Sequence, residues 1–332
     1  LSTIVIHEPY WPGMARHADI VLPSAVTLER DDIGATGRDP RLIAMRKAVE
    51  PYAESRTDYA IFSDLAEKLG VAERFTEGRS EAGWLRHIYE RWQEKAAQVS
   101  ITVPDFDQFW DEGSFELERP EQSLVMFQEF QADPEQSPLR TPSGKIEIYS
   151  ETIDGFGYDD CPGHPAWMEP YEWLHSPATE RFPLHLIANN PRTRLHSQLD
   201  LGGESQRSKV QGREPVRINP VDAAARGISD GDVVRLFNDR GSCLAGAVLS
   251  DDVRPRVIQL STGAWFDPLD PQSDDVFCVH GNPNTLPRDK GSSRLAQGCT
   301  GQHALVQIER WDAPLPPIHA YDPPEMKQRA ES

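Results

Sequence analysis

The sequence predicts a chain of mixed class, α/β plus all-β, with a remnant of an α/β sheet, a mixed region of helices and loops, and a closed β-barrel. Three observations support this prediction. Short apolar runs open the chain, apolar residues then recur at helical spacing, and short strands alternate with turns beyond residue 180. We expect an α/β end at 1–50, a mixed region with a linker at 51–180, a barrel at 181–312 and a tail at 313–332.

Composition narrows the class of protein. The chain has 332 residues, of which 38% are hydrophobic and 26% charged, which is typical of globular proteins with a sizeable core. The net charge of −19 argues against a general nucleic-acid binder, which needs a basic face. Apolar runs are too short to predict a membrane span.

The first 50 residues are expected to contain two short strands, Thr3 to His7 and Ile20 to Leu22. Because the chain opens inside a strand, we expect it to be the back part of a longer protein, whose targeting information would lie upstream. The segment from Glu29 to Arg38 is polar and contains glycine. It is interpreted as a loop, which either lines a cleft or is simply solvated.

The middle region is predicted to hold two helices, one capped by Thr57 or Asp58 and one over Glu81 to Gln98. Residues 104–140 are expected to be mainly loop, and 141–150 a turn followed by an alternating strand. Dense proline and glycine over 154–183 predict a linker and a domain boundary near 180.

Beyond this boundary, short apolar segments predict the strands of a barrel and one short helix. The strands are Leu184 to Ala188, Val216 to Ile218, Val233 to Phe237, Cys243 to Leu249 and Val257 to Leu260, and the helix runs from Asn219 or Pro220 to Ala225. The four cysteines show no CxxC spacing, so we expect reduced, partly buried thiols at Cys161, Cys243, Cys278 and Cys299.

The first candidate site is the loop after the strand at Leu184. It is dense in guanidinium, amide and imidazole groups, which match phosphate oxygens and base edges in fixed geometry. Taken alone, it is more readily interpreted as a solvated loop with a helix cap. The candidate residues are Asn190, Arg192, Arg194, His196, Ser197 and Gln198.

A second polar cluster runs from His280 to His303 and is rich in asparagine, glutamine and glycine. Glycines let a backbone approach a ligand closely, and amides recognise a base or pterin edge. The alternative is a long glycine-rich barrel loop. Two such loops on one barrel favour the two walls of a slot for a large polar cofactor, with Asn282, Asn284 and Gln297 in the second wall.

Several of these motifs, in this order, resemble the C-terminal part of bacterial molybdopterin enzymes. The subgroup is that of the dimethyl sulfoxide, trimethylamine N-oxide and biotin sulfoxide reductases, and two further segments, Ser143 to Glu147 and Cys161 to Pro165, look most like biotin sulfoxide reductase. The motifs are Ala18 to Pro23 with Leu28-Glu29, Arg192 to Gln198, Val216 to Gly241, His280 to Asn284, and Ala296 to Gly298.

The resemblance implies a molybdenum atom held by two molybdopterin guanine dinucleotides, with a double-psi β-barrel that binds them through loops matching the two polar clusters. The nine candidate residues named above carry over as cofactor-binding residues. In this family the protein ligand to molybdenum and the substrate-positioning aromatics lie in the N-terminal half. No catalytic residue and no metal ligand is therefore assigned to this chain, which we expect to be inactive alone.

The implied reaction is reduction of a small S-oxide or N-oxide, such as biotin sulfoxide, methionine sulfoxide, dimethyl sulfoxide or trimethylamine N-oxide, by oxygen-atom transfer to molybdenum. Its partners would be the N-terminal half of the same enzyme and an electron donor. Two alternatives remain: a non-catalytic double-psi barrel binding module, and a formate or nitrate type oxidoreductase. The resemblance leaves the compartment open between periplasm and cytoplasm.

Overall fold

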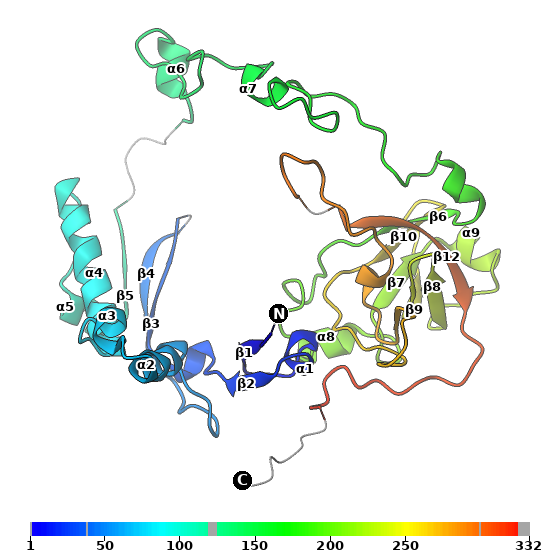
Figure 1. Cartoon of the computed structure of the whole chain (residues 1–332), viewed down its shortest axis with the longest axis horizontal. Coiled ribbons are helices and arrows are strands. Elements are labelled where there is room, and N and C mark those ends of the chain that lie inside the picture. The colour runs from blue at the N-terminus through cyan, green and yellow to red at the C-terminus, as the bar shows by residue number, and fades with distance from the viewer. Residues whose placement is uncertain (1, 38, 119–124, 299, 325–332) are drawn as a thin grey trace. The chain divides into compact units, whose positions relative to one another are not determined.

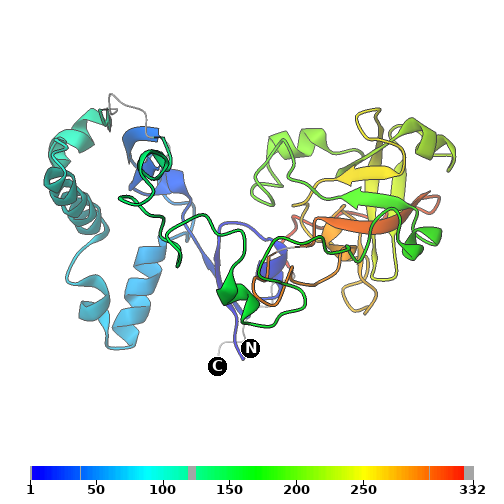
Figure 2. The same cartoon turned by 90° about the horizontal axis from the view of Figure 1, so that it is seen from above.

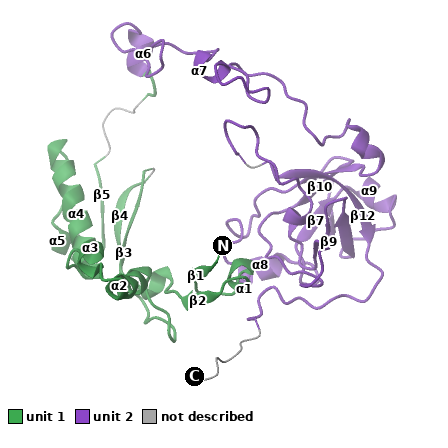
Figure 3. Ribbon diagram, in the orientation of Figure 1, with its two compact units in different colours: residues 1–127 green, residues 128–332 purple. Residues whose placement is uncertain are grey.

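The computed structural model describes residues 2–37, 39–118, 125–298 and 300–324. The chain forms two compact units, Leu1–Phe127 and Gln128–Ser332 (Figure 3). Within the described part of the chain, no helix is long and apolar enough to span a membrane.

The first unit begins with two strands, as the sequence predicts. Strand β1 (Val5–Glu8) pairs in parallel with β2 (Ile20–Pro23), and the short helix α1 (Gly13–Arg16) connects them. A 3-10 turn, η1 (Thr27–Glu29), follows.

A three-stranded antiparallel sheet replaces the polar loop that was expected from Glu29 to Arg38. Its strands are β3 (Asp32–Thr36), β4 (Asp39–Met45) and β5 (Ser114–Glu116). The loop prediction is wrong at 32–36 because these residues pair with β4, whose Leu42 and Ala44 are buried in an aromatic core. Arg38 lies outside the described residues.

The two predicted helices of the first unit are confirmed. Helix α2 (Asp58–Lys68) is capped by Thr57, whose Oγ1 accepts from the Ala60 N–H at 3.1 Å, and α4 is Glu81–Gln98. Between them lies α3 (Ala72–Thr76). The prediction of loop over 104–140 is wrong at α5 (Phe106–Glu112), which packs because the fully buried Phe109 ring stacks on Tyr89, 4.7 Å between ring centroids.

The second unit opens with the short helices α6 (Gln128–Ala132) and α7 (Glu151–Asp154). The strand expected within 141–150 is wrong: Ile146 and Ile148 alternate with polar residues but are 72% and 80% exposed, without a pairing strand among the described residues. The proline-rich segment that follows contains one regular element, the 3-10 turn η2 (Pro177–Glu180).

The predicted barrel is confirmed as a closed barrel of six strands (Figure 1 and Figure 2). The order around it is β9, β7, β10, β6, β12 and β8, and pairing of β8 with β9 closes it. β6 runs parallel to β10, and β7 runs parallel to β9. The strands are β6 (Leu184–Ile187), β7 (Pro215–Ile218), β8 (Val233–Phe237), β9 (Ser242–Leu249), β10 (Val257–Leu260) and β12 (His303–Arg310).

Smaller elements decorate the barrel: α8 (Gly203–Ser208), α9 (Pro220–Ala224), the two-residue strand β11 (Phe277–Cys278) and the 3-10 turn η3 (Pro283–Thr285). Asn219 caps α9, as the sequence predicts. The core is aliphatic and also encloses Cys243 and Cys278 as free thiols. Burial raises the pKa of the Cys243 thiol. Cys161 is half-buried and free, and Cys299 lies outside the described residues.

Candidate cofactor-binding site

The two predicted loops meet the barrel at the same end. The first loop, residues 188–200, leaves β6 after Ile187, and the second loop, residues 287–302, enters β12 at His303. Ile187 and His303 are direct partners in the antiparallel ladder, and the Ala188 N–H donates to the Gln302 carbonyl at 2.9 Å. Strand pairing therefore places the start of one loop beside the end of the other.

Most predicted residues of the first loop are exposed. Five of the six lie on the surface of the second unit: Asn190, Arg192, His196, Ser197 and Gln198. The backbone that carries them is strained, because His196 and Leu199 hold φ of 50° and 55°, in the left-handed region that side chains disfavour. Such strain persists only where the surroundings impose it.

The turn after β10 imposes part of this conformation. Gly263 has φ of 97°, and a Cβ added there would lie only 1.9 Å from the His196 carbonyl oxygen. The Ser197 carbonyl accepts a hydrogen bond from Trp265 Nε1 at 2.9 Å. The first loop is thus pressed against a turn that only glycine allows.

Arg194 differs from its neighbours because its side chain is 1% exposed. Its Nε donates to the His196 carbonyl and its Nη1 to Ser205 Oγ, both at 3.1 Å, and its Nη2 lies 3.1 Å from a Glu214 oxygen. All three nitrogens have protein partners, so in this conformation the buried Arg194 side chain supports the loop from its interior side. Its predicted contact with a cofactor stays a prediction.

Arg194 belongs to a group of charges under the loops, which we call the buried ion cluster. Lys209 Nζ lies 2.9 Å from an Asp200 oxygen and 3.1 Å from a Glu214 oxygen, and these side chains are 2% exposed or less. Two cations and two anions thus neutralise each other, as buried charges require. The cluster consists of Arg194, Asp200, Lys209, Glu214 and His280.

The pKa values within the cluster follow from burial and pairing. Burial alone would raise the pKa of Asp200, but Lys209 and the Trp265 N–H outweigh it and hold that pKa below its usual range. Burial, followed by the charge of Lys209, lowers the pKa of His280 to about 4. His280 is therefore neutral at pH 7. It opens the second polar segment, so the cluster joins the end of the first loop to the segment that leads into the second loop.

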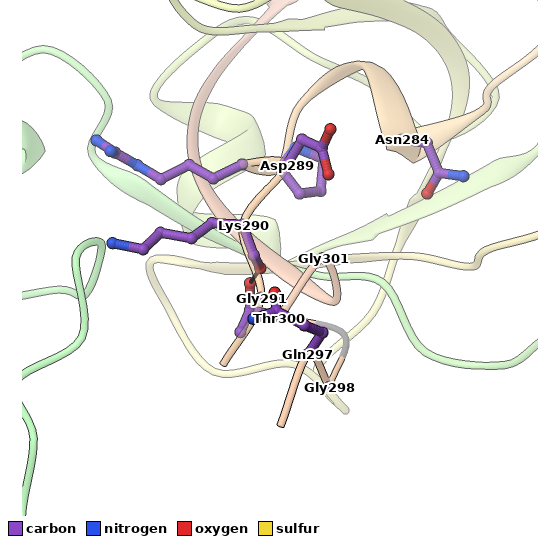
Figure 4. A pocket seen from close by; sticks show the side chains of 10 residues that line it. Asn284, Asp289, Lys290, Gly291, Gln297, Gly298, Thr300 and Gly301 are labelled. Atoms are coloured by element: carbon purple, nitrogen blue, oxygen red, sulfur yellow. Dashed lines mark hydrogen bonds between the residues drawn. The ribbon is translucent and has the colours of Figure 1, made fainter. Parts of the chain in front are cut away.

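The second loop supplies a cavity. Asn284 and Gln297 line a cavity of about 670 Å³ together with Arg288 and Lys290 (Figure 4). Figure 4 shows the Lys290 side chain extending away from Asn284. The third predicted residue, Asn282, uses its side-chain oxygen to accept from the Asn284 N–H at 2.9 Å, which caps η3. The remaining lining residues are Pro287, Asp289, Gly291, Gly298, Thr300 and Gly301.

Sequence reasoning missed Arg288 and Lys290, which bring positive charge to this cavity. Arg288 Nε donates to Glu172 Oε1 at 3.1 Å, and Arg240 pairs with the same carboxylate at 2.6 Å. Burial alone would raise the pKa of Glu172, but hydrogen bonds from Arg240, the Leu305 N–H and Arg288 lower it. Glu172 therefore stays ionised and holds Arg288 at the cavity. The Lys290 amine lies 4.0 Å from the Tyr171 ring centroid and hydrogen-bonds its hydroxyl.

The lining of the cavity thus has two cations and one carboxylate, that of Asp289, with amides and glycine backbone. Its charge is net positive, which is chemistry suited to phosphate oxygens and base edges. None of the first-loop candidates lines this cavity. Asn284 and Gln297 therefore share one pocket, and the first loop lies outside its lining. Among the described residues, no group of three or more His, Cys, Asp or Glu side chains could hold a metal ion.

Comparison with known proteins identifies this arrangement. Residues 184–305 match the molydopterin dinucleotide binding domain, and residues 1–68 match the molybdopterin oxidoreductase family. The fold resembles that of acetylene hydratase from Pelobacter acetylenicus, with a TM-score of 0.69 over 93% of this chain and 40% of that chain, at 18% identity. The match of residues 184–305 assigns the barrel and its polar loops to the molydopterin dinucleotide binding domains.

Two relatives narrow the class. The chain is 46% identical to the dimethyl sulfoxide/trimethylamine N-oxide reductase of Cereibacter sphaeroides over 98% of its length, and 43% identical to the trimethylamine-N-oxide reductase of Salmonella typhi over 100%. It spans about 40% of the length of each. The chain is the cofactor-binding C-terminal part of a molybdopterin oxidoreductase of the dimethyl sulfoxide/trimethylamine N-oxide reductase family.

Proposed function

We propose that the complete protein reduces dimethyl sulfoxide or trimethylamine N-oxide with a molybdenum bis(molybdopterin guanine dinucleotide) cofactor, part of which this chain binds. The names of the relatives support the substrate class, and the cationic cavity supports the cofactor. When bound, the cofactor supplies the oxygen-atom transfer and the two electrons. The role of this chain is to hold and orient it.

The donors of the cavity fit an anionic dinucleotide. Lys290 offers a compact positive charge to a phosphate, and Arg288 offers a planar one that Glu172 keeps in place. The amides of Asn284 and Gln297 present paired donors and acceptors to a base or pterin edge.

The first loop would supply the first wall of the same site. Its exposed donors, carried by strained backbone, are held ready for a ligand without rearrangement. We assign cofactor contacts to Asn190, Arg192, His196, Ser197 and Gln198, and we assign Arg194 to the support of that loop.

The substrate and the partners are part of the proposal. The expected likeness to biotin sulfoxide reductase is not supported by the relatives reported above, which are named for dimethyl sulfoxide and trimethylamine N-oxide. Biotin sulfoxide and methionine sulfoxide therefore enter only as comparison substrates. The N-terminal half of the same enzyme would supply the metal ligand, and a separate electron donor would supply reducing equivalents.

The proposal is tested by expressing this chain joined to its upstream coding sequence. We expect molybdenum and guanine nucleotide in the purified enzyme, and oxidation of a reduced viologen dye that depends on dimethyl sulfoxide or trimethylamine N-oxide. Biotin sulfoxide and methionine sulfoxide are assayed alongside. An enzyme that reduces these oxides without molybdenum would overturn the proposal.

The cavity is tested separately with Lys290→Met in the same enzyme. Loss of one charge-assisted contact should lower guanine nucleotide content and weaken its retention about tenfold or more. Lys145→Met is the matched control, because Lys145 is an exposed lysine outside the cavity. Equal nucleotide content in the two variants would exclude Lys290 from the site.

A further inference from the structure

The C-terminal segment after β12, residues 313–322, is fastened to the barrel. Arg213 Nη2 donates to the Pro316 carbonyl at 2.7 Å, and the His319 N–H donates to Asp267 Oδ2 at 2.6 Å. Between and beyond these points Ile318 packs against Gly212, and Ala320 is 1% exposed. The segment is therefore a built part of the barrel's surface.

Its Tyr321 reaches the buried ion cluster. The hydroxyl lies 3.0 Å from Asp200 Oδ2 and 2.9 Å from His280 Nε2, and it accepts from Gln206 Nε2 at 2.8 Å. The ring packs against Trp265 and His280, at centroid distances of 5.4 and 5.2 Å.

The hydrogen atoms in this contact can be counted. His280 Nδ1 lies 2.9 Å from the Trp265 carbonyl, which can only accept, so Nδ1 carries the hydrogen and Nε2 of the neutral ring is an acceptor. Asp200 Oδ2 is also an acceptor. The Asp200 carbonyl, at 3.3 Å, is a third acceptor. The single hydroxyl hydrogen of Tyr321 is therefore shared between Asp200, at the end of the first loop, and His280, at the start of the second polar segment.

We propose that Tyr321 is a positioning residue whose hydroxyl ties Asp200 to His280, so that the C-terminal segment fixes the two dinucleotide-binding loops relative to each other. The link between the segment and the loops follows from these contacts alone. Its effect on the cofactor rests on the proposed function.

The test uses the full chain with Tyr321→Phe, which removes the hydroxyl and keeps the ring. Amide hydrogen exchange is followed by mass spectrometry, and we expect about tenfold faster exchange in segments 189–200 and 280–298, with the barrel strands unchanged. Affinity for GDP, a probe for the nucleotide half of the cofactor, should fall about tenfold. Tyr52→Phe is the control, since Tyr52 is 81% exposed in the first unit.

A second readout separates positioning from general packing. Removing the hydroxyl removes the donor to neutral His280, so the pKa of His280, followed by NMR, should rise in Tyr321→Phe and stay unchanged in Tyr52→Phe. Unchanged exchange in either loop, or equally faster exchange in all barrel strands, would overturn the proposal. Absence of GDP binding to the unmodified chain would count against the proposed function, while the exchange result still decides the role of Tyr321.

Discussion

The two polar loops lie side by side but are held in different ways. The first is anchored by Arg194, whose side chain is 1% exposed and fully partnered. The second is anchored by Arg288, whose side chain is 51% exposed, and by surface contacts of Lys290 with the Tyr171 hydroxyl and of the Arg294 N–H with Asp160 Oδ2 at 3.1 Å. Bonds within the loop add to these, such as that from Gln297 Nε2 to the Ser293 carbonyl at 2.8 Å. One wall of the candidate site is therefore preformed, and the other is free to adjust.

The difference follows from the energetics of charge. Removing one partner of a buried pair leaves an uncompensated charge, so a buried cluster enforces a single arrangement. An exposed pair is screened by water and contributes little. The first loop should therefore respond strongly to changes at its anchor, and the second loop weakly.

The largest effect is expected from Arg194→Met. It leaves Glu214 and Asp200 short of a buried cation, and should destabilise the chain by about 3–5 kcal/mol in urea unfolding followed by tryptophan fluorescence. Arg192→Met is the matched control, because Arg192 is exposed on the same loop and should change stability by less than about 0.5 kcal/mol. Equal effects of the two variants on stability would show that the buried ion cluster does not anchor the first loop.

A smaller effect is expected from Gly263→Ala. The added Cβ would lie 1.9 Å from the His196 carbonyl oxygen, so the loop must move. The free energy of unfolding should therefore fall by about 3 kcal/mol. Gly231→Ala is the control, since Gly231 also has a left-handed φ, 83°, but nothing within 4 Å. It should cost only about 1–2 kcal/mol for the backbone conformation. A difference near zero would mean that the turn does not constrain the first loop.

The smallest effect is expected at the second anchor. Glu172→Gln keeps the shape but removes the charge that Arg240 and Arg288 share, and should destabilise by about 1.5–3 kcal/mol, against little change for the exposed Glu169→Gln. The stability that Glu172 provides should also depend on pH. Because the pKa of Glu172 is lowered in the fold from 4.5, this stabilisation is complete above about pH 4.5 and is lost as the pH falls through the lower folded value.

The difference in free energy of unfolding between wild type and Glu172→Gln, measured at stepped pH, should therefore become smaller in acid. A difference that stays constant with pH would contradict this.

Much of the fold could be predicted from local sequence. The Thr57 cap and the helical spacing of α2 and α4 are local signals, and so are the apolar runs of the barrel strands. The hairpin of β3 and β4 was missed because β3 has polar ends, Asp32 and Thr36, around Gly34, which is not typical of a strand, and because its stability depends on a distant aromatic core. Ile146 and Ile148 show the reverse, since alternation without a partner strand gives no strand.

The candidate site also has one part that local sequence predicts and one part that it does not. Exposed donor-rich loops are visible in the sequence because their residue types are unusual in combination. The anchors are not visible, because Glu172 and Arg288 are 116 residues apart and nothing local marks either as a partner of the other. The roles assigned to Arg192, Asn284 and the other exposed candidates stay predictions until cofactor binding is measured.

The pairing of Ile187 with His303 has a consequence for how this protein can change over time. A one-residue slip in β6 or β12 would turn the core side chains of that strand outward, so the register between the two strands is fixed by the core. The bases of the two loops therefore cannot drift apart. Insertions and deletions within the loops are the changes that leave the barrel intact, and new specificity would be acquired there.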